Sequence, residues 1–193
     1  MKPFALALAF LPLANSQTVS VVQPDATDLQ LVGAQSPGFQ DALAAVLSPQ
    51  ISSQLFAYLP FTVVLKNTSR QALAGYRFWW AINPAPDQRT GGRGDGLLFI
   101  TDTSGYLQPG ASAVAMPQFI LTHDPGTDLL EEMQQQQSSI LSGLQRARVI
   151  GISLDSAIFA SGQFVGPDVG GTSHKTRHPS AAGGRWTQAY NRN

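Results

Sequence analysis

The sequence predicts a mainly β protein, an antiparallel immunoglobulin-like β-sandwich with one inserted or packed helix near residues 127–145. Three observations support this class. Short segments with apolar residues at alternating positions recur along the chain, and turns rich in glycine and proline separate them. No regular alternation of strand and helix indicates a parallel sheet. The length of 193 residues suits a single domain.

We expect strands over residues 18–23, 29–32, 60–67 and 73–82, with a short helix over 38–47. Phe61, Val63 and Leu65 share one face of their strand, while Thr62 and Lys66 lie on the other. Because only a turn at residues 67–69 separates strand 60–67 from strand 73–82, the two are expected to pair as an antiparallel hairpin.

A loop over residues 83–96 leads to the second half, where strands are expected over 97–101, 111–120, 148–159 and 163–165. Pro117 suggests an edge or a bulge in its strand. Helix formers over 127–145 predict the helix, with Asp124 or Thr127 as its cap. Ser153 and Asp155 are expected to face outward. The predicted core is Phe61, Val63, Leu65, Phe78, Trp80, Ile150, Ile152 and Leu154.

The first 16 residues have the pattern of a secretory signal peptide. Lys2 precedes an apolar run over residues 4–13, and Ala14 and Ser16 are the small residues expected before a cut at Gln17. The run is shorter than the roughly 20 residues of a membrane span. A buried N-terminal helix or strand is the alternative. We therefore expect an exported chain, periplasmic or extracellular, without a transmembrane segment.

The composition excludes several classes. The chain has 12 basic and 12 acidic residues, which argues against a nucleic-acid partner because phosphate binding needs a basic surface. It has no cysteine, so disulfide scaffolds, thiol nucleophiles and cysteine-ligated metal sites are excluded. The division expected is a signal peptide over 1–16, the sandwich over 17–169 and a basic, disordered tail over 170–193. The alternative for the tail is a basic arm on an anionic envelope surface.

Two segments resemble a recurring pattern in exported bacterial β-sandwich proteins of unknown function. The first is residues 61–80, FTVVLKNTSRQALAGYRFWW, and the second is residues 154–168, LDSAIFASGQFVGPD. Together they cover about 35 of the 193 residues. The resemblance implies a secreted sandwich domain and carries no activity. The residues after Gly170 depart from the pattern, in which a charged helix is usual.

Four short motifs have both a functional and a structural interpretation. Arg93-Gly94-Asp95 is an integrin-type tripeptide or a plain turn. Asn67-Thr68-Ser69 is an N-glycosylation acceptor or a hairpin turn. His174 and His178 have the i, i+4 spacing of zinc ligands, although the glycines and proline around them argue against a helix. His123 and Asp124 form a catalytic dyad or a hydrogen-bonded helix start. In each case we favour the structural interpretation.

The sequence carries no nucleophile elbow, no evident carboxylate pair and no phosphate-binding loop. We therefore expect no catalytic residue, no metal site and no cofactor, and the sequence assigns no ligand-binding residue.

Trp79 has the most interest for binding, because it must point away from the face that Trp80 shares with Tyr76 and Phe78. It is either an exposed aromatic platform or is covered by the helix or the N-terminal segment. Two functions follow. The first is a non-catalytic exported domain that binds a protein or an envelope component. The second is a carbohydrate-binding or hydrolytic module that uses the Trp79 face.

Overall fold

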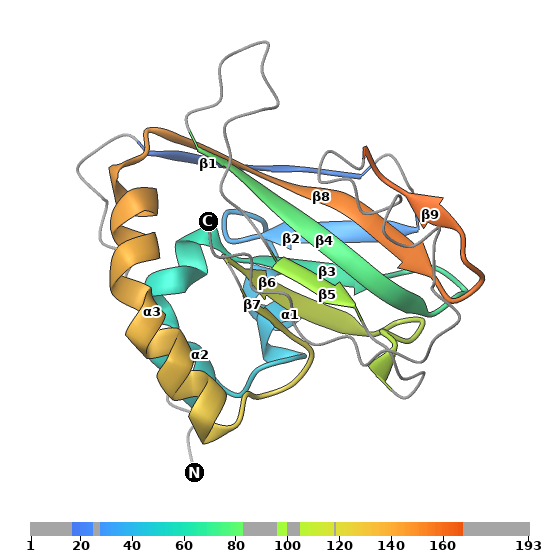
Figure 1. Cartoon of the computed structure of the whole chain (residues 1–193), viewed down its shortest axis with the longest axis horizontal. Coiled ribbons are helices and arrows are strands. Elements are labelled where there is room, and N and C mark those ends of the chain that lie inside the picture. The colour runs from blue at the N-terminus through green and yellow to red at the C-terminus, as the bar shows by residue number, and fades with distance from the viewer. Residues whose placement is uncertain (1–16, 25–27, 83–95, 100–104, 118, 168–193) are drawn as a thin grey trace, which may run out of the picture.

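The computed structural model describes residues 17–24, 28–82, 96–99, 105–117 and 119–167. They form a mainly β structure in which two sheets face each other, with helices gathered at one end (Figure 1). The predicted mainly β class is therefore confirmed.

Sheet A has the strand order β1-β8-β4-β5, and a short strand β9 also pairs with β8. Its strands are β1 (Thr18–Val22), β4 (Leu73–Ile82), β5 (Gly96–Phe99), β8 (Val149–Phe159) and β9 (Phe164–Val165). Sheet B has the order β2-β3-β6-β7. Its strands are β2 (Leu29–Gly33), β3 (Val63–Asn67), β6 (Ser112–Met116) and β7 (Phe119–Leu121).

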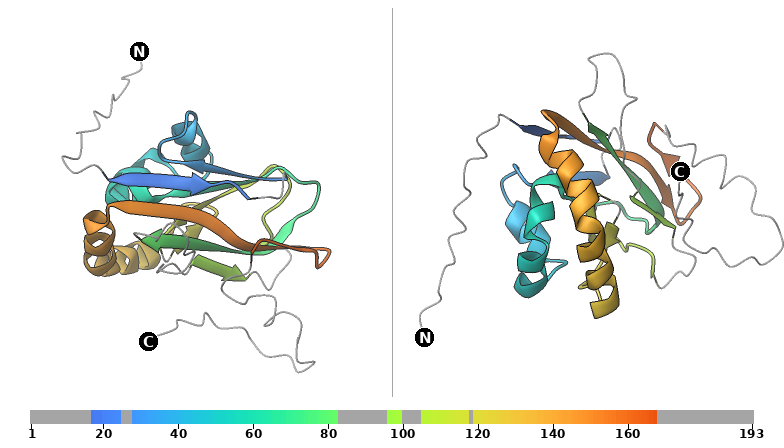
Figure 2. Two further views of the ribbon diagram at one scale, coloured as in Figure 1. Left: turned by 90° about the horizontal axis from the view of Figure 1, so that it is seen from above. Right: turned by 60° about the vertical axis from the view of Figure 1, so that its left-hand side comes forward.

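The helices are α1 (Phe39–Ala44), α2 (Pro49–Gln54), the 3-10 helix η1 (Phe56–Phe61) and α3 (Thr127–Arg146). Helix η1 contacts both α2 and α3, and the three stand together at one end of the sheets (Figures 1 and 2). The Tyr58 hydroxyl donates to the Met133 carbonyl at 3.2 Å and ties η1 to the middle of α3. The sequence predicted α3 to within a residue of each end but did not predict α2 or η1.

The cap expected for α3 is wrong in detail. Gly126 is the N-cap residue and supplies no side-chain hydrogen bond. The Asp124 carboxylate instead accepts the Ser48 backbone N–H at 2.7 Å, and Ser48 is itself the N-cap of α2. Asp124 therefore joins the β7–α3 connection to the start of α2.

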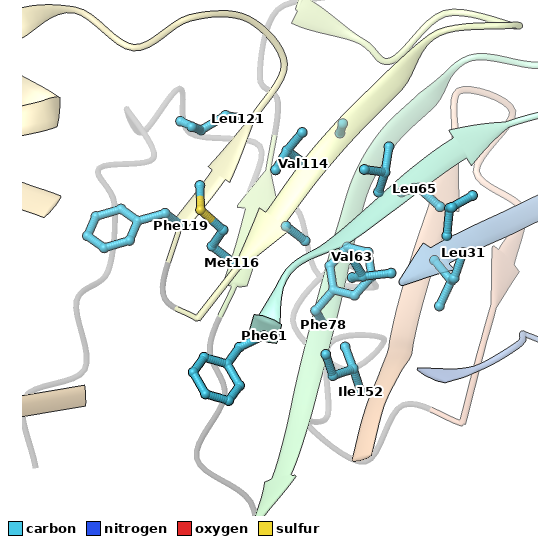
Figure 3. Packing of buried hydrophobic residues seen from close by; sticks show 14 of the residues in the cluster. Leu31, Phe61, Val63, Leu65, Phe78, Val114, Met116, Phe119, Leu121 and Ile152 are labelled. Atoms are coloured by element: carbon cyan, nitrogen blue, oxygen red, sulfur yellow. The ribbon is translucent and has the colours of Figure 1, made fainter. Parts of the chain in front are cut away.

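The core lies between the sheets and is confirmed residue by residue. All eight side chains that the strand faces predict as core are at most 3% exposed. In Figure 3, Phe78 and Ile152 from sheet A lie close to Val63 and Phe61 from the opposite layer. The indole Nε1 of Trp80 donates to the Phe61 carbonyl at 2.9 Å, so a hydrogen bond also links the two layers.

Strands β3 and β4 do not form the expected hairpin. They lie in different sheets, because β3 pairs with β2 and β6 while β4 pairs with β8 and β5. Thr62 and Val64 are buried as well, so the stretch is covered on both faces rather than half-exposed. A strand enclosed on both faces shows no alternation from which its sheet can be inferred.

Two strand boundaries also differ from expectation. Pro60 and Phe61, expected in the strand, belong to η1. Thr62 is the C-cap residue of η1, and its Oγ1 donates to the Tyr58 carbonyl at 2.9 Å. The single strand expected over residues 111–120 is two strands, β6 and β7, which pair antiparallel on either side of Pro117. Proline has no N–H for the ladder, so it lies in the turn rather than within a strand.

Strand β1 closes one side of the sandwich. It pairs parallel with β8, from Thr18 opposite Val149 to Val22 opposite Ser153, and it contacts β2 of the other sheet (Figure 2, left). A Cβ atom on Gly33 would overlap the Val21 side chain, so the glycine permits this close approach. After β1, the Gln23 amide donates to the Leu31 carbonyl and accepts the Leu31 N–H, so it occupies the outer edge of β2.

Candidate functional site

The outer face of sheet A carries the side chains that point away from the core. On β4 these include Arg77 and Trp79, which alternate with buried Tyr76, Phe78 and Trp80. Across the strand pair, Trp79 lies opposite Ser153 and Arg77 lies opposite Ser156. Residues directly opposite in an antiparallel pair share a face. The sequence therefore placed Trp79 on the correct face.

A β-bulge interrupts this face. The register moves from Arg77–Ser156 to Phe78–Leu154, so β8 carries one extra residue, Asp155. The other edge of β8 is also divided here, because β1 pairs with it up to Ser153 and β9 pairs from Ala157 onward. Bulges re-aim side chains and are common beside functional sites.

The bulge is covered from the β9 side. Gly166, directly after β9, has φ 116° and lies so close to the Asp155 carbonyl that a side chain there would overlap the backbone. Only glycine adopts such a backbone conformation without strain. Asp155 is 1% exposed, although the sequence predicts an outward-facing residue.

We define the bulge cluster as Arg77, Trp79, Asp155 and Ser156. Arg77 Nε lies 3.8 Å from Asp155 Oδ2, and the Arg77 side chain is 13% exposed. The Arg77 Cζ atom lies 6.0 Å from the centroid of the Trp79 ring. A guanidinium at this range is attracted to the negative face of an indole, so Arg77 connects a buried carboxylate to a half-buried aromatic ring.

Two polar atoms of the bulge cluster are buried and find no hydrogen-bond partner among the residues that the structure describes. They are the indole Nε1 of Trp79 and the hydroxyl Oγ of Ser156. Buried polar atoms are nearly always hydrogen-bonded, and an unsatisfied one costs about 1–3 kcal/mol. Of the cluster, only the Trp79 ring and the Arg77 guanidinium are partly exposed, so these two groups are the ones that a ligand could contact.

Trp79 is neither a fully exposed aromatic platform nor a fully covered side chain, the two alternatives that the sequence leaves open. Its side chain is half-buried, and Arg77 lies over its ring. The outer-face residues beside it are small, with Ala81 next along β4 and Gly151 opposite Ala81 on β8.

The glycosylation motif is part of the fold. Asn67 is fully buried, and its Nδ2 donates to the carbonyls of Gln71 and Leu107, each at 2.9 Å. Its Oδ1 accepts from the Ser69 N–H and the Ser69 hydroxyl. The amide nitrogen that would carry a glycan is already used, which supports the interpretation as a turn. The turn connects the two sheets and is not a hairpin.

His123 and Asp124 are not joined to each other by any hydrogen bond in the described structure. His123 Nδ1 lies 3.0 Å from Thr122 Oγ1, while Asp124 accepts from Ser48. The pair is thus divided between two structural contacts. The other motifs, Arg93-Gly94-Asp95 and the histidines His174 and His178, lie outside the described residues, as do the signal peptide and the tail.

Within the described ranges, no three His, Cys, Asp or Glu side chains are grouped so that they could hold a metal ion. Of the helices described, none has the length and apolar character to cross a membrane.

The sequence did not predict the bulge cluster as a unit. It singled out Trp79 from the strand phase and expected Asp155 to face outward, but it had no signal that joins Arg77 to Asp155 across a bulge. The one available signal was Gly166 after the last hairpin, since an isolated glycine near a strand often marks close backbone approach.

Comparison with protein-family models, with curated proteins and with solved structures finds no match for this chain. The resemblance of residues 61–80 and 154–168 to exported bacterial proteins stays a prediction.

Proposed function

We propose that the chain is an exported bacterial β-sandwich domain that is not an enzyme and that binds another protein or an envelope component through the outer face of sheet A. The observation that carries the proposal is the placement of Trp79 beside Arg77 on this face. Tryptophan and arginine are over-represented among the residues that dominate binding energies. Here both lie on paired strands rather than on loops, which holds them in place before a partner arrives.

Export is supported by the position of the first strand. β1 begins at Thr18, so a cut before Gln17 leaves every described strand and helix intact. The predicted signal peptide and the fold are therefore compatible.

The immunoglobulin-like class of the sandwich is also part of the proposal. The chain passes from β3 in sheet B to β4 and β5 in sheet A, returns to β6 and β7, and ends on β8 and β9. Repeated crossing between sheets is typical of such sandwiches. An experimental structure in which β4 and β8 belonged to different sheets would contradict this assignment.

The binding proposal is tested by affinity capture from the envelope fraction of the host with the full chain as bait. We expect a partner to be retained by the wild type and lost with Trp79→Ala, while the melting temperature stays the same. Phe56→Ala is the matched control, because Phe56 is 52% exposed on η1, away from sheet A. If the wild type retains no partner and deletion of the gene leaves the envelope intact, the proposal is wrong.

A carbohydrate ligand is the second candidate, favoured by the half-buried indole ring of Trp79 on the outer face of sheet A, next to the partly exposed Arg77. Sugars are bound by an aromatic face together with hydrogen-bonding groups at its edge. Titration with polysaccharide is expected to quench the tryptophan fluorescence of the wild type and not that of Trp79→Ala. A flat titration of the wild type would remove this candidate.

A further inference from the structure

The side chain of Gln17 is bound to the end of helix α3. Its Nε2 donates to the Leu144 carbonyl at 2.7 Å and to the Ala147 carbonyl at 2.9 Å. The Leu144 carbonyl lies in the last turn of α3, where it also accepts the Ala147 N–H at 3.1 Å, and Ala147 is the C-cap residue. The next residue continues the attachment, since the Thr18 N–H donates to the Arg148 carbonyl at 2.8 Å.

The same residue is the first one after the predicted signal-peptide cut. An N-terminal glutamine has a reaction that an internal one lacks. Its free α-amine attacks the side-chain carbon Cδ, a new N–Cδ bond closes a five-membered lactam, and the Cδ–Nε2 bond breaks. The nitrogen Nε2 leaves as ammonia, and the product is pyroglutamate.

This reaction and the contacts of Gln17 exclude each other. The nitrogen that leaves in the reaction is the atom that binds Leu144 and Ala147. Ring closure also requires the amide to turn back toward its own α-nitrogen, so both hydrogen bonds must break first. In addition, the carbonyl end of a helix favours a positive charge nearby, which favours the α-amine as ammonium, a form that cannot attack.

We propose that helix α3 protects the N-terminal Gln17 of the exported chain from cyclisation, so that the folded protein keeps a free α-amine and an intact side-chain amide. This inference rests on the proposed export. Cyclisation then depends on folding: it is slow in the folded domain and ordinary in the unfolded chain.

The test is to express the full chain with its own leader in a bacterial host, isolate the exported form and follow its intact mass. We expect a chain that begins at Gln17 and retains the mass of the ammonia. Its loss of ammonia should be on the order of tenfold slower, or more, in buffer than in denaturant, because two hydrogen bonds oppose it in the folded state.

Two variants examine the role of α3. Leu144→Ala removes most of a buried side chain from the last turn, and Ala147→Gly loosens the C-cap residue and removes only one buried methyl group. Each is expected to accelerate ammonia loss in a chain that circular dichroism shows to be folded. Gln145→Ala, an exposed position in the same turn, is the matched control and should leave the rate unchanged.

The outcomes are distinct. A chain that begins at Gln17 but is already pyroglutamate when isolated folded overturns this inference and leaves the proposed export standing. Equal rates in buffer and in denaturant have the same meaning. A chain that retains residues 1–16 overturns the export proposal and this inference together.

Discussion

Asn67 and Leu107 are 40 positions apart and are joined by a buried hydrogen bond of 2.9 Å from the Asn67 side-chain amide to the Leu107 carbonyl. The same amide also reaches Gln71, so one side chain holds the β3–β4 turn to the chain before β6. A further bond strengthens the junction, as the Asn67 N–H donates to the Ala111 carbonyl. This turn directs the chain from sheet B into sheet A.

Asn67→Ala is expected to lower the free energy of unfolding by about 2–4 kcal/mol. The variant removes four hydrogen bonds of the Asn67 amide, to the carbonyls of Gln71 and Leu107 and from the N–H and hydroxyl of Ser69. Each such bond contributes about 0.5–1.5 kcal/mol, and the Leu107 carbonyl keeps the Leu73 N–H as a partner. Chemical denaturation measures the loss. Thr68→Ala, at an exposed neighbouring position, should change the stability by less than about 0.5 kcal/mol. Equal losses for the two variants would mean that the amide contacts are not what holds the turn.

The burial of Asn67 also predicts the fate of the chain in a host that glycosylates nascent proteins. A glycan attached before folding removes one Nδ2 hydrogen and cannot be enclosed in the core. We expect the folded, secreted protein to be unmodified and any glycosylated fraction to be retained in the cell. A mobility shift after glycosidase treatment measures this. Secreted, folded protein with a glycan on Asn67 would contradict the structure.

Trp80 contributes both core packing and a hydrogen bond from sheet A to the Phe61 carbonyl at the end of η1. Trp80→Ala should cost about 3–5 kcal/mol, as large aromatic truncations in cores do. Trp80→Phe keeps much of the apolar volume but leaves the Phe61 carbonyl without its donor, so a smaller loss of about 1–3 kcal/mol is expected. Thermal melts of the wild type, Trp80→Phe and Trp80→Ala should give melting temperatures that fall in that order. If Trp80→Ala melts within a few degrees of the wild type, the phase assigned to β4 is wrong.

Gly33 and Val21 provide a test of how β1 is seated. Gly33→Ala places a methyl group against the Val21 side chain and should destabilise the protein by about 1–3 kcal/mol. Val21→Ala in the same chain relieves the overlap, so the double variant should lose less than the sum of the single losses. Gly143→Ala is the control, since a side chain there has open space within α3 and should stabilise the helix. If the stability losses of the two single variants are strictly additive in the double variant, Val21 and Gly33 are not in contact and β1 does not lie against Gly33.

Tyr76 makes the stability sensitive to alkali. Burial raises the pKa of Tyr76 above its ordinary value of about 10, and its hydroxyl has no hydrogen-bond partner among the described residues. A raised pKa means that the fold favours the neutral hydroxyl, so the full stability is present below about pH 10 and is lost as the pH rises above it. Tyr76→Phe should therefore lose less stability than the wild type between about pH 9 and pH 11.

Tyr58 is the comparison for Tyr76. Burial raises the pKa of Tyr58 as well, but its hydroxyl donates to the Met133 carbonyl. At neutral pH, Tyr58→Phe should cost about 0.5–1.5 kcal/mol, whereas Tyr76→Phe removes an unpaired group and should cost little or stabilise. Melts at several pH values check both. A larger neutral-pH loss for Tyr76→Phe would show that its hydroxyl has a partner.

The sequence predicted the positions of most strands, the long helix and the core, because these follow from local patterns. The alternation at Phe78 and Trp80 needs no knowledge of the rest of the chain. The pairing of β8 with β9 also follows from the sequence, because the turn Ala160-Ser161-Gly162 predicts a tight hairpin there. The pairing of β3 with β4 was predicted wrongly. The sequence of the β3–β4 turn is equally compatible with a hairpin and with a change of sheet. The outcome depends on the buried contacts that Asn67 makes with residues far along the chain.

The candidate site was less predictable than the fold. Trp79 was identified from one strand alone, but its relation to Asp155 depends on an extra residue in the neighbouring strand. An outward position in an alternating pattern also predicts exposure. Asp155 is buried at a bulge against which the turn at Gly166 lies closely, and a pattern within one strand has no information about such a neighbour.

The parallel pairing of β1 with β8 determines when the protein can finish folding. The first strand of the domain begins at Thr18, and its partner begins at Val149. The chain must therefore be available as far as β8 before this edge of sheet A can form. Contacts between such distant segments make folding slow. A partly emerged chain therefore lacks the partner of β1 and leaves this edge of sheet A open, which is compatible with the export that we propose.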